Sequence, residues 1–176
     1  EIEAKKNIGF LPENNPLYPE MHVKEYLNFV ADLHKIPKER IDEVIELVGI
    51  TPEKSKKISQ LSKGYKQRVG LAQAILGFPK IIILDEPTVG LDPKQIIEIR
   101  ELIRELAKEH TVILSSHILA EIQEVCDYIM IISKGKLVSS DTPENLEKLL
   151  TNQQTVEILA KGNEDTVRKV IGTIGN

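Results

Sequence analysis

The 176-residue sequence has one cysteine, no tryptophan and only 4% aromatic residues. Because Cys126 has no second cysteine to pair with, an internal disulfide and a cysteine-based structural zinc site are both excluded. The longest unbroken apolar run, residues 128–132, has five residues, whereas a membrane-spanning helix needs about 20. The formal charge of −4, from 23 basic and 27 acidic residues, leaves no broad basic excess for binding a nucleic acid.

Hydrophobic residues make up 41% of the chain and charged residues 28%, which is typical of a globular domain with a sizeable core. Apolar spacing predicts strands and helices in alternation. We expect strands at residues 7–11, 81–84, 111–114 and 128–132, and helices at residues 23–33, 41–48, 63–76, 94–109 and 118–126. Residues 81–84 (IIIL) are apolar on both faces, as expected for a central parallel strand that is covered on two sides. The series predicts an α/β fold with a layered parallel sheet.

The last third of the chain has a different pattern. A turn at residues 133–136 predicts a hairpin in which residues 136–139 form the returning strand, and residues 142–150 have a helical pattern. A further strand at residues 155–160 and a helix at residues 165–174 have no partner strand after them. We interpret residues 151–176 as the start of a small, truncated C-terminal α+β domain.

Two adjacent acids, Asp85 and Glu86, come directly after the predicted central strand. Open α/β sheets bind ligands at the carboxyl ends of their strands, so one acid is placed to hold a metal and the other to activate a water. The simpler alternative is a buried strand followed by an acidic turn. His117 follows the next strand of the series, where a neutral imidazole could hold a terminal phosphate or an attacking water. A lone histidine in that place is more often a loop or cap residue.

Two helix starts have the residues that cap helices. Ser62 precedes the long helical pattern, with Gly64 in its first turn, and Asp92-Pro93 opens the next helix. The free N–H groups at such an end can bind an anion. Without further context, a plain N-cap is the simpler interpretation of both.

In this order, the segments resemble the nucleotide-binding subunit of ATP-binding cassette (ABC) transporters. LSKGYKQRVGLAQA resembles the signature helix of that family, IIILDEPTVGLDP its Walker B strand and D-loop, and SSH its switch histidine, while FLPENNPLYPEM lies where the family has its glutamine loop. The resemblance covers about residues 7–150 and is closest to the exporter-type branch. It implies a sheet of P-loop NTPase type with an inserted helical subdomain at about residues 20–78, within a partial ATPase domain of residues 1–150.

The resemblance also implies residue roles. Asp85 would hold Mg²⁺ through water, Glu86 would be the general base, and His117 would hold the γ-phosphate of ATP. Each signature helix in the family completes the site of a second subunit, which here would involve Ser62, Lys63, Gly64 and Tyr65, with Asp92 at the dimer seam.

Three positions depart from the family pattern. Glu13 stands where a glutamine normally links magnesium to the transport partner; a carboxylate can serve a metal but repels phosphate. Lys63 replaces a glycine of the signature and adds a cation near the expected phosphate, and Tyr65 replaces a glutamine.

The chain lacks the pattern G-x-x-x-x-G-K-[ST], whose glycines and lysine surround nucleotide phosphates. Its one Gly-Lys pair, Gly135-Lys136, is followed by Leu137, and Met130 stands where the first glycine should be. Either the sequence is an internal fragment of a longer subunit, or it is a degenerate cassette. We favour the fragment and predict that these residues alone bind ATP weakly or not at all, and are inactive.

The function implied is a motor subunit that uses ATP and Mg²⁺, pairs with a second ATP-binding subunit and drives a transmembrane partner from the cytoplasmic face of the cell membrane, with no nucleic acid partner. One alternative is a soluble ATPase of the same superfamily that serves chromosomes or translation. The members of the superfamily that serve chromosomes have a long coiled coil inserted at this point of the chain. Here only about 48 residues separate Glu13 from Leu61, which disfavours that class. The other alternative is a cassette remnant that binds a partner without turnover.

Overall fold

The computed structural model describes residues 7–151, and for residues 149–151 their backbone alone. The chain divides into two compact units, Glu1–Asp127 and Tyr128–Asn176, which are described separately here. The expected domain boundary near residue 150 stays a prediction, as do the strand and helix expected beyond residue 151, which lie outside the described residues.

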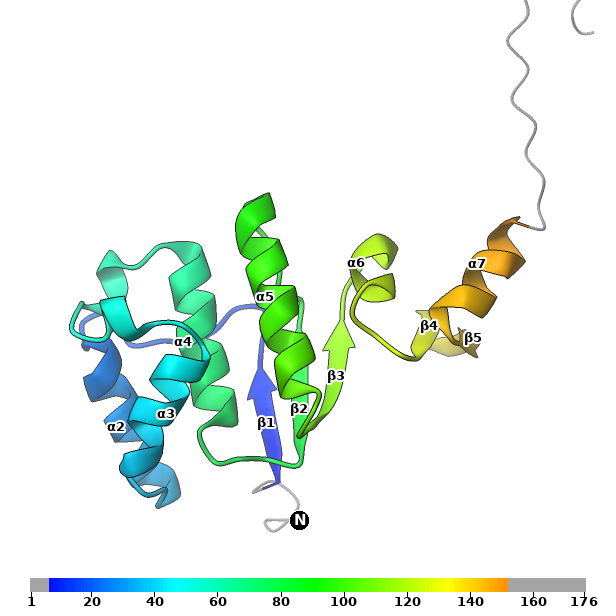
Figure 1. Cartoon of the computed structure of the whole chain (residues 1–176). Coiled ribbons are helices and arrows are strands. Elements are labelled where there is room, and N and C mark those ends of the chain that lie inside the picture. Colours follow the sequence, from blue (N-terminus) through cyan, green and yellow to red (C-terminus); the bar gives the residue numbers. More distant parts are fainter. Residues whose placement is uncertain (1–6, 152–176) are drawn as a thin grey trace, which may run out of the picture. The chain divides into compact units, whose positions relative to one another are not determined.

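A three-stranded parallel sheet forms the centre of the first unit (Figure 1). Its strands are β1 (Ile8–Leu11), β2 (Ile81–Asp85) and β3 (Thr111–Ser115), in the order β1-β2-β3. Ile81 is in register with Ile8 on one side and with Thr111 on the other. The prediction of a parallel sheet with residues 81–84 as a central strand is therefore confirmed.

Helices fill the interval between β1 and β2. They are α2 (Val23–His34), α3 (Glu39–Leu47), the short 3₁₀ helices η1 (Thr51–Glu53) and η2 (Ile58–Gln60), and α4 (Lys63–Ile75). Buried apolar residues recur at helical spacing on α2 and α3, as their sequences predict. Figure 1 shows α2 and α3 together beside α4, which lies next to β1.

The connections after β2 are also helical. Helix α5 (Pro93–Leu106) joins β2 to β3, and α6 (Leu119–Gln123) follows β3. The helix expected at residues 118–126 is shorter than predicted: Ile118 has an extended backbone, and the helix ends at its C-cap, Glu124. A five-residue helix gains few internal hydrogen bonds, so tertiary contacts decide its ends.

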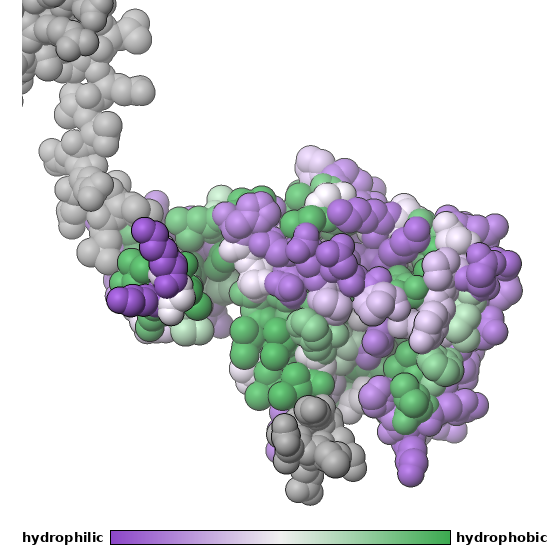
Figure 2. Space-filling view, turned by 180° about the vertical axis from the view of Figure 1, so that it is seen from behind, coloured by the Kyte–Doolittle hydropathy of each residue, from purple (hydrophilic) through white to green (hydrophobic). Residues whose placement is uncertain are grey.

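One hydrophobic core joins the helices to one face of the sheet. Ile82 and Leu84 of β2 are buried in it together with Ile99 and Ile103 of α5. The expectation that β2 is covered on both faces is met only in part within the described residues, because Ile81 and Ile83 on its second face are half-buried. On the opposite face, side chains of the flanking strands are exposed, namely Ile8, Phe10 and Ile113. Figure 2 shows apolar residues gathered on the side away from the viewer of Figure 1. The apolar pattern IIIL is compatible with a strand that is covered on one face or on both, because the residues of a strand do not determine which helices pack against it.

The second unit contains a hairpin and a helix. Strand β4 (Ile129–Ser133) pairs antiparallel with β5 (Lys136–Asp141), and α7 (Pro143–Thr151) follows. The predicted hairpin is confirmed, but the placing of residues 128–132 in the parallel series is wrong: among the described residues β4 pairs with β5 alone. The turn between β4 and β5, in which Gly135 has a φ of 73°, allows these two neighbouring strands to pair with each other. No helix within residues 7–151 is long and apolar enough to cross a membrane.

Candidate functional site

The carboxyl ends of β2 and β3 bring the predicted catalytic residues together. Asp85 ends β2 and is in register with Ser115, the last residue of β3. His117 follows two residues later, and its Nδ1 lies 2.9 Å from Oε1 of Glu86. The expected proximity of the two acids and the histidine is therefore confirmed, while their roles stay predictions.

Glu86 has an unusual backbone and an incompletely partnered side chain. Its φ is +48°, a left-handed backbone conformation that residues other than glycine seldom adopt and that recurs at functional sites. The side chain is only 18% exposed. Its Oε2 is buried and has no hydrogen-bond partner among the described residues. One oxygen thus contacts His117, and the other is buried and left without a partner.

The His117 imidazole is 69% exposed and lies in a negative field. The hydrogen bond that the His117 ring makes to the Glu86 carboxylate is the main cause that raises the pKa of His117 above its usual value of 6.5. The negative charges of Glu86, Glu121 and Glu13 raise this pKa further. We expected a neutral imidazole here; the observed surroundings favour the protonated form, because three carboxylates stabilise the cation.

Ser115 is a member of this group that the sequence reasoning missed. Its Oγ donates a hydrogen bond to Oδ1 of Asp85 at 2.6 Å. It also lies 3.2 Å from the Glu86 backbone N–H, which donates to the Ser115 carbonyl at the same distance. The register of two adjacent parallel strands was the signal that could have identified it, since residues that end such strands lie side by side.

The oxygen donors here suit Mg²⁺ better than a softer metal. Within residues 7–151 no group of three or more His, Cys, Asp or Glu side chains is arranged to hold a metal. Mg²⁺ requires fewer: it commonly uses one or two carboxylates and completes its shell with water and substrate phosphates. Asp85, with one oxygen held by Ser115, fits that requirement.

A second group of predicted residues lies at the starts of α4 and α5. The Ser62 side chain caps α4 by accepting a hydrogen bond from the Tyr65 N–H at 3.4 Å, and the Asp92 side chain caps α5 by accepting from the Gln95 N–H at 3.0 Å. Both predicted N-caps are confirmed. Gly64 faces the end of the Gln95 side chain, which would lie 2.7 Å from an added β-carbon and would have to shift to admit one.

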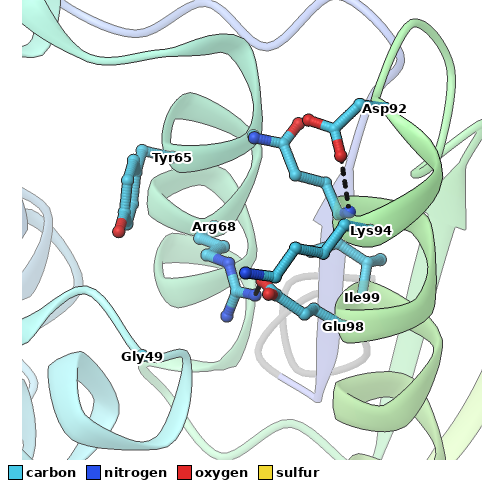
Figure 3. A pocket seen from close by; sticks show the side chains of 9 residues that line it. Gly49, Tyr65, Arg68, Asp92, Lys94, Glu98 and Ile99 are labelled. Carbon is cyan, nitrogen blue, oxygen red and sulfur yellow. Dashed lines mark hydrogen bonds and ion pairs between the residues drawn. The ribbon is translucent and has the colours of Figure 1, made fainter.

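A polar pocket of about 270 Å³ opens between these helices (Figure 3). Gly64, Tyr65 and Asp92 line it, whereas the other candidate residues do not. Lys63 points elsewhere: its Nζ lies over Gly90, where an added β-carbon would be only 2.1 Å away. The φ of +68° at Gly90 favours a glycine, whereas the Lys63 ammonium is the end of a flexible side chain and could shift.

Arg68 joins three helices at the pocket and was not singled out from the sequence. Its Nη2 lies 2.7 Å from Oε2 of Glu98 on α5, and its Nη1 donates to the Val48 carbonyl at the end of α3, also at 2.7 Å. In Figure 3 the Arg68 and Glu98 side chains point toward each other from α4 and α5. Arg68 thereby connects the helices before β2 to the helix that follows it.

A buried network also fixes the loop that follows Glu86. The Thr88 hydroxyl donates to Oε2 of Glu121 at 2.5 Å, and both residues are less than 10% exposed. Arg100 of α5 lies 3.9 Å from the other oxygen of Glu121 and 2.7 Å from Oε2 of Glu124. These contacts connect the loop after β2 to α5 and to α6, which begins two residues after His117.

The two groups remain separate within one chain. No hydrogen bond or ion pair in the described part of the chain joins Asp85, Glu86 or His117 to Ser62, Tyr65 or Asp92.

Comparison with known proteins gives matches along most of the chain. A family model described as "ABC transporter" matches residues 1–89. The ABC transporter ATP-binding protein YhcH of Bacillus subtilis is 46% identical over 139 residues, covering 77% of this chain and 46% of that protein. The bacitracin transport ATP-binding protein BcrA of Bacillus licheniformis is 43% identical, covering 83% of this chain and 49% of that protein.

Among solved structures, cbiO1 from Clostridium perfringens, described as part of the ABC transporter complex cbiONQ, matches with a TM-score of 0.76 and 30% identity. The match covers 84% of this chain and 61% of that one. The chain spans about half the length of the curated relatives reported above.

Proposed function

The chain belongs to the ABC transporter family, and from that premise we propose that it is part of an ATP-hydrolysing subunit that drives substrate movement through a membrane partner. The observation that carries this proposal is the group at the ends of β2 and β3. Two adjacent acids and a histidine meet there, with one Glu86 oxygen bonded to His117 and the other buried without a partner.

In this proposal each side chain has one task. Glu86 accepts a proton from the attacking water through its unpartnered oxygen, and His117 holds the terminal phosphate. Asp85 holds Mg²⁺ through water, and Glu13 is a second candidate for the metal. When bound with ATP, Mg²⁺ neutralises phosphate charge. The protonated form of His117, which its acidic neighbours favour, would add a positive charge beside the phosphate.

We propose that a second ATP-binding subunit supplies the other half of the site. Ser62, Lys63, Gly64 and Tyr65 would face the nucleotide of that subunit, and Asp92 would lie at the seam. The N–H groups at the start of α4 suit an anion, because a helix N-terminus carries partial positive charge.

The partner and the location are part of the same proposal. The helical unit of α2 and α3, with the Glu13 loop, would pass the closing motion to a transmembrane subunit. The complete subunit would then lie at the cytoplasmic face of the membrane. The exporter-type resemblance of the sequence favours export. Because the pattern G-x-x-x-x-G-K-[ST] is not among these residues, the 176-residue chain alone should bind ATP weakly or not at all.

Glu86→Gln in the complete subunit tests this function. The amide keeps the size of the side chain but cannot take a proton, so ATP turnover should fall by about 100-fold or more. Nucleotide-dependent dimers should still form, because phosphate binding does not need this carboxylate. Glu101→Gln, an exposed acid on α5, is the matched control and should leave turnover unchanged. Full ATP turnover by the Glu86→Gln variant would show that Glu86 is not the general base. A complete subunit with no turnover at all would favour the non-catalytic remnant.

A further inference from the structure

Ser115 contacts both acids of the candidate site from the neighbouring strand. Its hydroxyl donates to Oδ1 of Asp85 at 2.6 Å and lies 3.2 Å from the backbone N–H of Glu86. The Ser115 carbonyl accepts from the same N–H. A single residue of β3 therefore holds the side chain of one acid and the backbone of the other.

We propose that Ser115 is a positioning residue for ATP hydrolysis, which sets the orientation of the Asp85 carboxylate for Mg²⁺ and holds Glu86 in its left-handed conformation. This inference rests on the proposed function and assigns a role to a residue outside the phosphate-contacting set. Ser115 acts through Asp85 and Glu86 and is not itself expected to touch the nucleotide.

Asp85 needs an external contact to fix the orientation of its carboxylate. The terminal torsion of an aspartate is broad, so the carboxylate plane is poorly fixed by the side chain's own preferences. A short hydrogen bond to one oxygen fixes that plane and leaves the second oxygen turned away from the donor. Partners of this kind in metal sites orient the ligand, and their loss commonly reduces metal affinity by about 10- to 100-fold.

Glu86 needs an external contact to hold its backbone. Its φ of +48° is strained for a residue with a side chain, and such conformations persist where the surroundings hold them. The two Ser115 oxygens are the recorded acceptors for the Glu86 N–H. Without the Ser115 hydroxyl, only the Ser115 carbonyl would accept from the Glu86 N–H, so the left-handed conformation of Glu86 would be held less firmly.

The adjacent Ser116 provides an internal comparison. Its Oγ accepts a hydrogen bond from the Ile118 N–H at 3.1 Å, which is a local turn, and it has no recorded bond to either acid. If any hydroxyl in this loop had the same effect, Ser116 would be as sensitive as Ser115. Our proposal predicts that it is not.

The test compares Ser115→Val with Ser115→Thr in the complete subunit. The two replacements have the same shape and both suit a strand, but only threonine keeps the hydroxyl. Mn²⁺ is used in place of Mg²⁺ and its binding with ATP is measured by electron paramagnetic resonance on a Glu86→Gln background, so no turnover is needed. Ser115→Val should weaken Mn²⁺ binding about 10-fold or more, whereas Ser115→Thr and Ser116→Ala should stay within about 2-fold of the parent.

A second readout uses the 176-residue chain itself. Amide hydrogen exchange at Glu86 should be faster in Ser115→Val than in Ser115→Thr, because the N–H loses one acceptor. The proposal is overturned if the Val and Thr variants bind Mn²⁺ equally well, or if Ser116→Ala has the same effect as Ser115→Val.

These outcomes are separate from failure of the proposed function. If Glu86→Gln abolishes turnover but Ser115→Val leaves Mn²⁺ binding unchanged, Ser115 loses its role and the ATPase assignment remains. If Glu86→Gln leaves turnover intact, the catalytic assignment fails, while the Glu86 amide exchange still reports whether Ser115 holds that backbone.

Discussion

Replacing Thr88 with valine should destabilise the first unit, because the Thr88 hydroxyl is the recorded hydrogen-bond donor to a buried carboxylate. Thr88 is 8% exposed, Glu121 is 9% exposed, and their oxygens are 2.5 Å apart. Valine has the shape of threonine, so no cavity forms and the change isolates the hydrogen bond. Leaving a buried charged acceptor without its donor costs about 2 to 3 kcal/mol of unfolding free energy.

Arg100 reduces the loss of unfolding free energy expected in Thr88→Val but does not abolish it. Its guanidinium lies 3.9 Å from Oε1 of Glu121, beyond hydrogen-bond distance, and its stronger contact is to Glu124 at 2.7 Å. The charge of Glu121 therefore remains partly compensated in Thr88→Val, but Oε2 has no replacement donor among the recorded contacts.

Urea denaturation of the 176-residue chain, followed by circular dichroism, measures the effect. Thr88→Val should lower the midpoint at an unchanged slope, whereas Thr88→Ser, which keeps the hydroxyl, should recover at least half of the loss. Thr111→Val, at an exposed position at the start of β3, is the matched control and should change stability by about 0.5 kcal/mol at most. If Thr88→Val is as stable as the parent, or if the serine variant is no better than valine, the network does not stabilise this loop.

Three further measurements test the local environments. The pKa of His117, followed by NMR in this chain, should lie above 6.5 and fall toward that value in Glu86→Gln. Since the pKa of His117 is raised on folding, its contact with Glu86 stabilises the chain fully below pH 6.5 and loses this effect as pH rises through the raised pKa. A His117 pKa of 6.5 in the unmodified chain would contradict the prediction. Burial raises the pKa of Tyr26 from 10.0 to about 12, so absorbance should show a tyrosine ionisation near pH 12, and the stability from keeping Tyr26 neutral should be lost between pH 10 and 12. The absence of any tyrosine ionisation near pH 12 would refute this. Asp92→Ala removes the cap of α5 and should cost about 1 kcal/mol, while Asp92→Ser should cost less; equal losses in both variants would show that the cap is unimportant.

Local sequence signals predicted the helix starts well. Ser62 and Asp92 cap α4 and α5 as expected, because capping depends on residues within three positions of each other. The meeting of Glu86 and His117 was also predictable, since adjacent parallel strands end at one edge of the sheet.

Features set by distant segments were predicted poorly. Residues 128–132 have a buried-strand pattern, yet pair only in a local hairpin among the described residues. The Thr88 hydroxyl and the Glu121 carboxylate lie 33 positions apart, and no local pattern predicts that they meet. The Ser115 contacts required the exact strand register, which a periodic apolar pattern does not fix to one residue.

The central claim is that Glu86 of one subunit and Ser62 of another act in the same hydrolysis site, and complementation tests it most directly. Complete subunits carrying either Glu86→Gln or Ser62→Arg should each be inactive alone. In a mixed dimer one site would combine native Glu86 from one variant with native Ser62 from the other. After subunit exchange, a 1:1 mixture should therefore hydrolyse ATP at about a quarter of the unmodified rate. If mixed dimers form but stay inactive, both residues act within a single chain and the account is wrong.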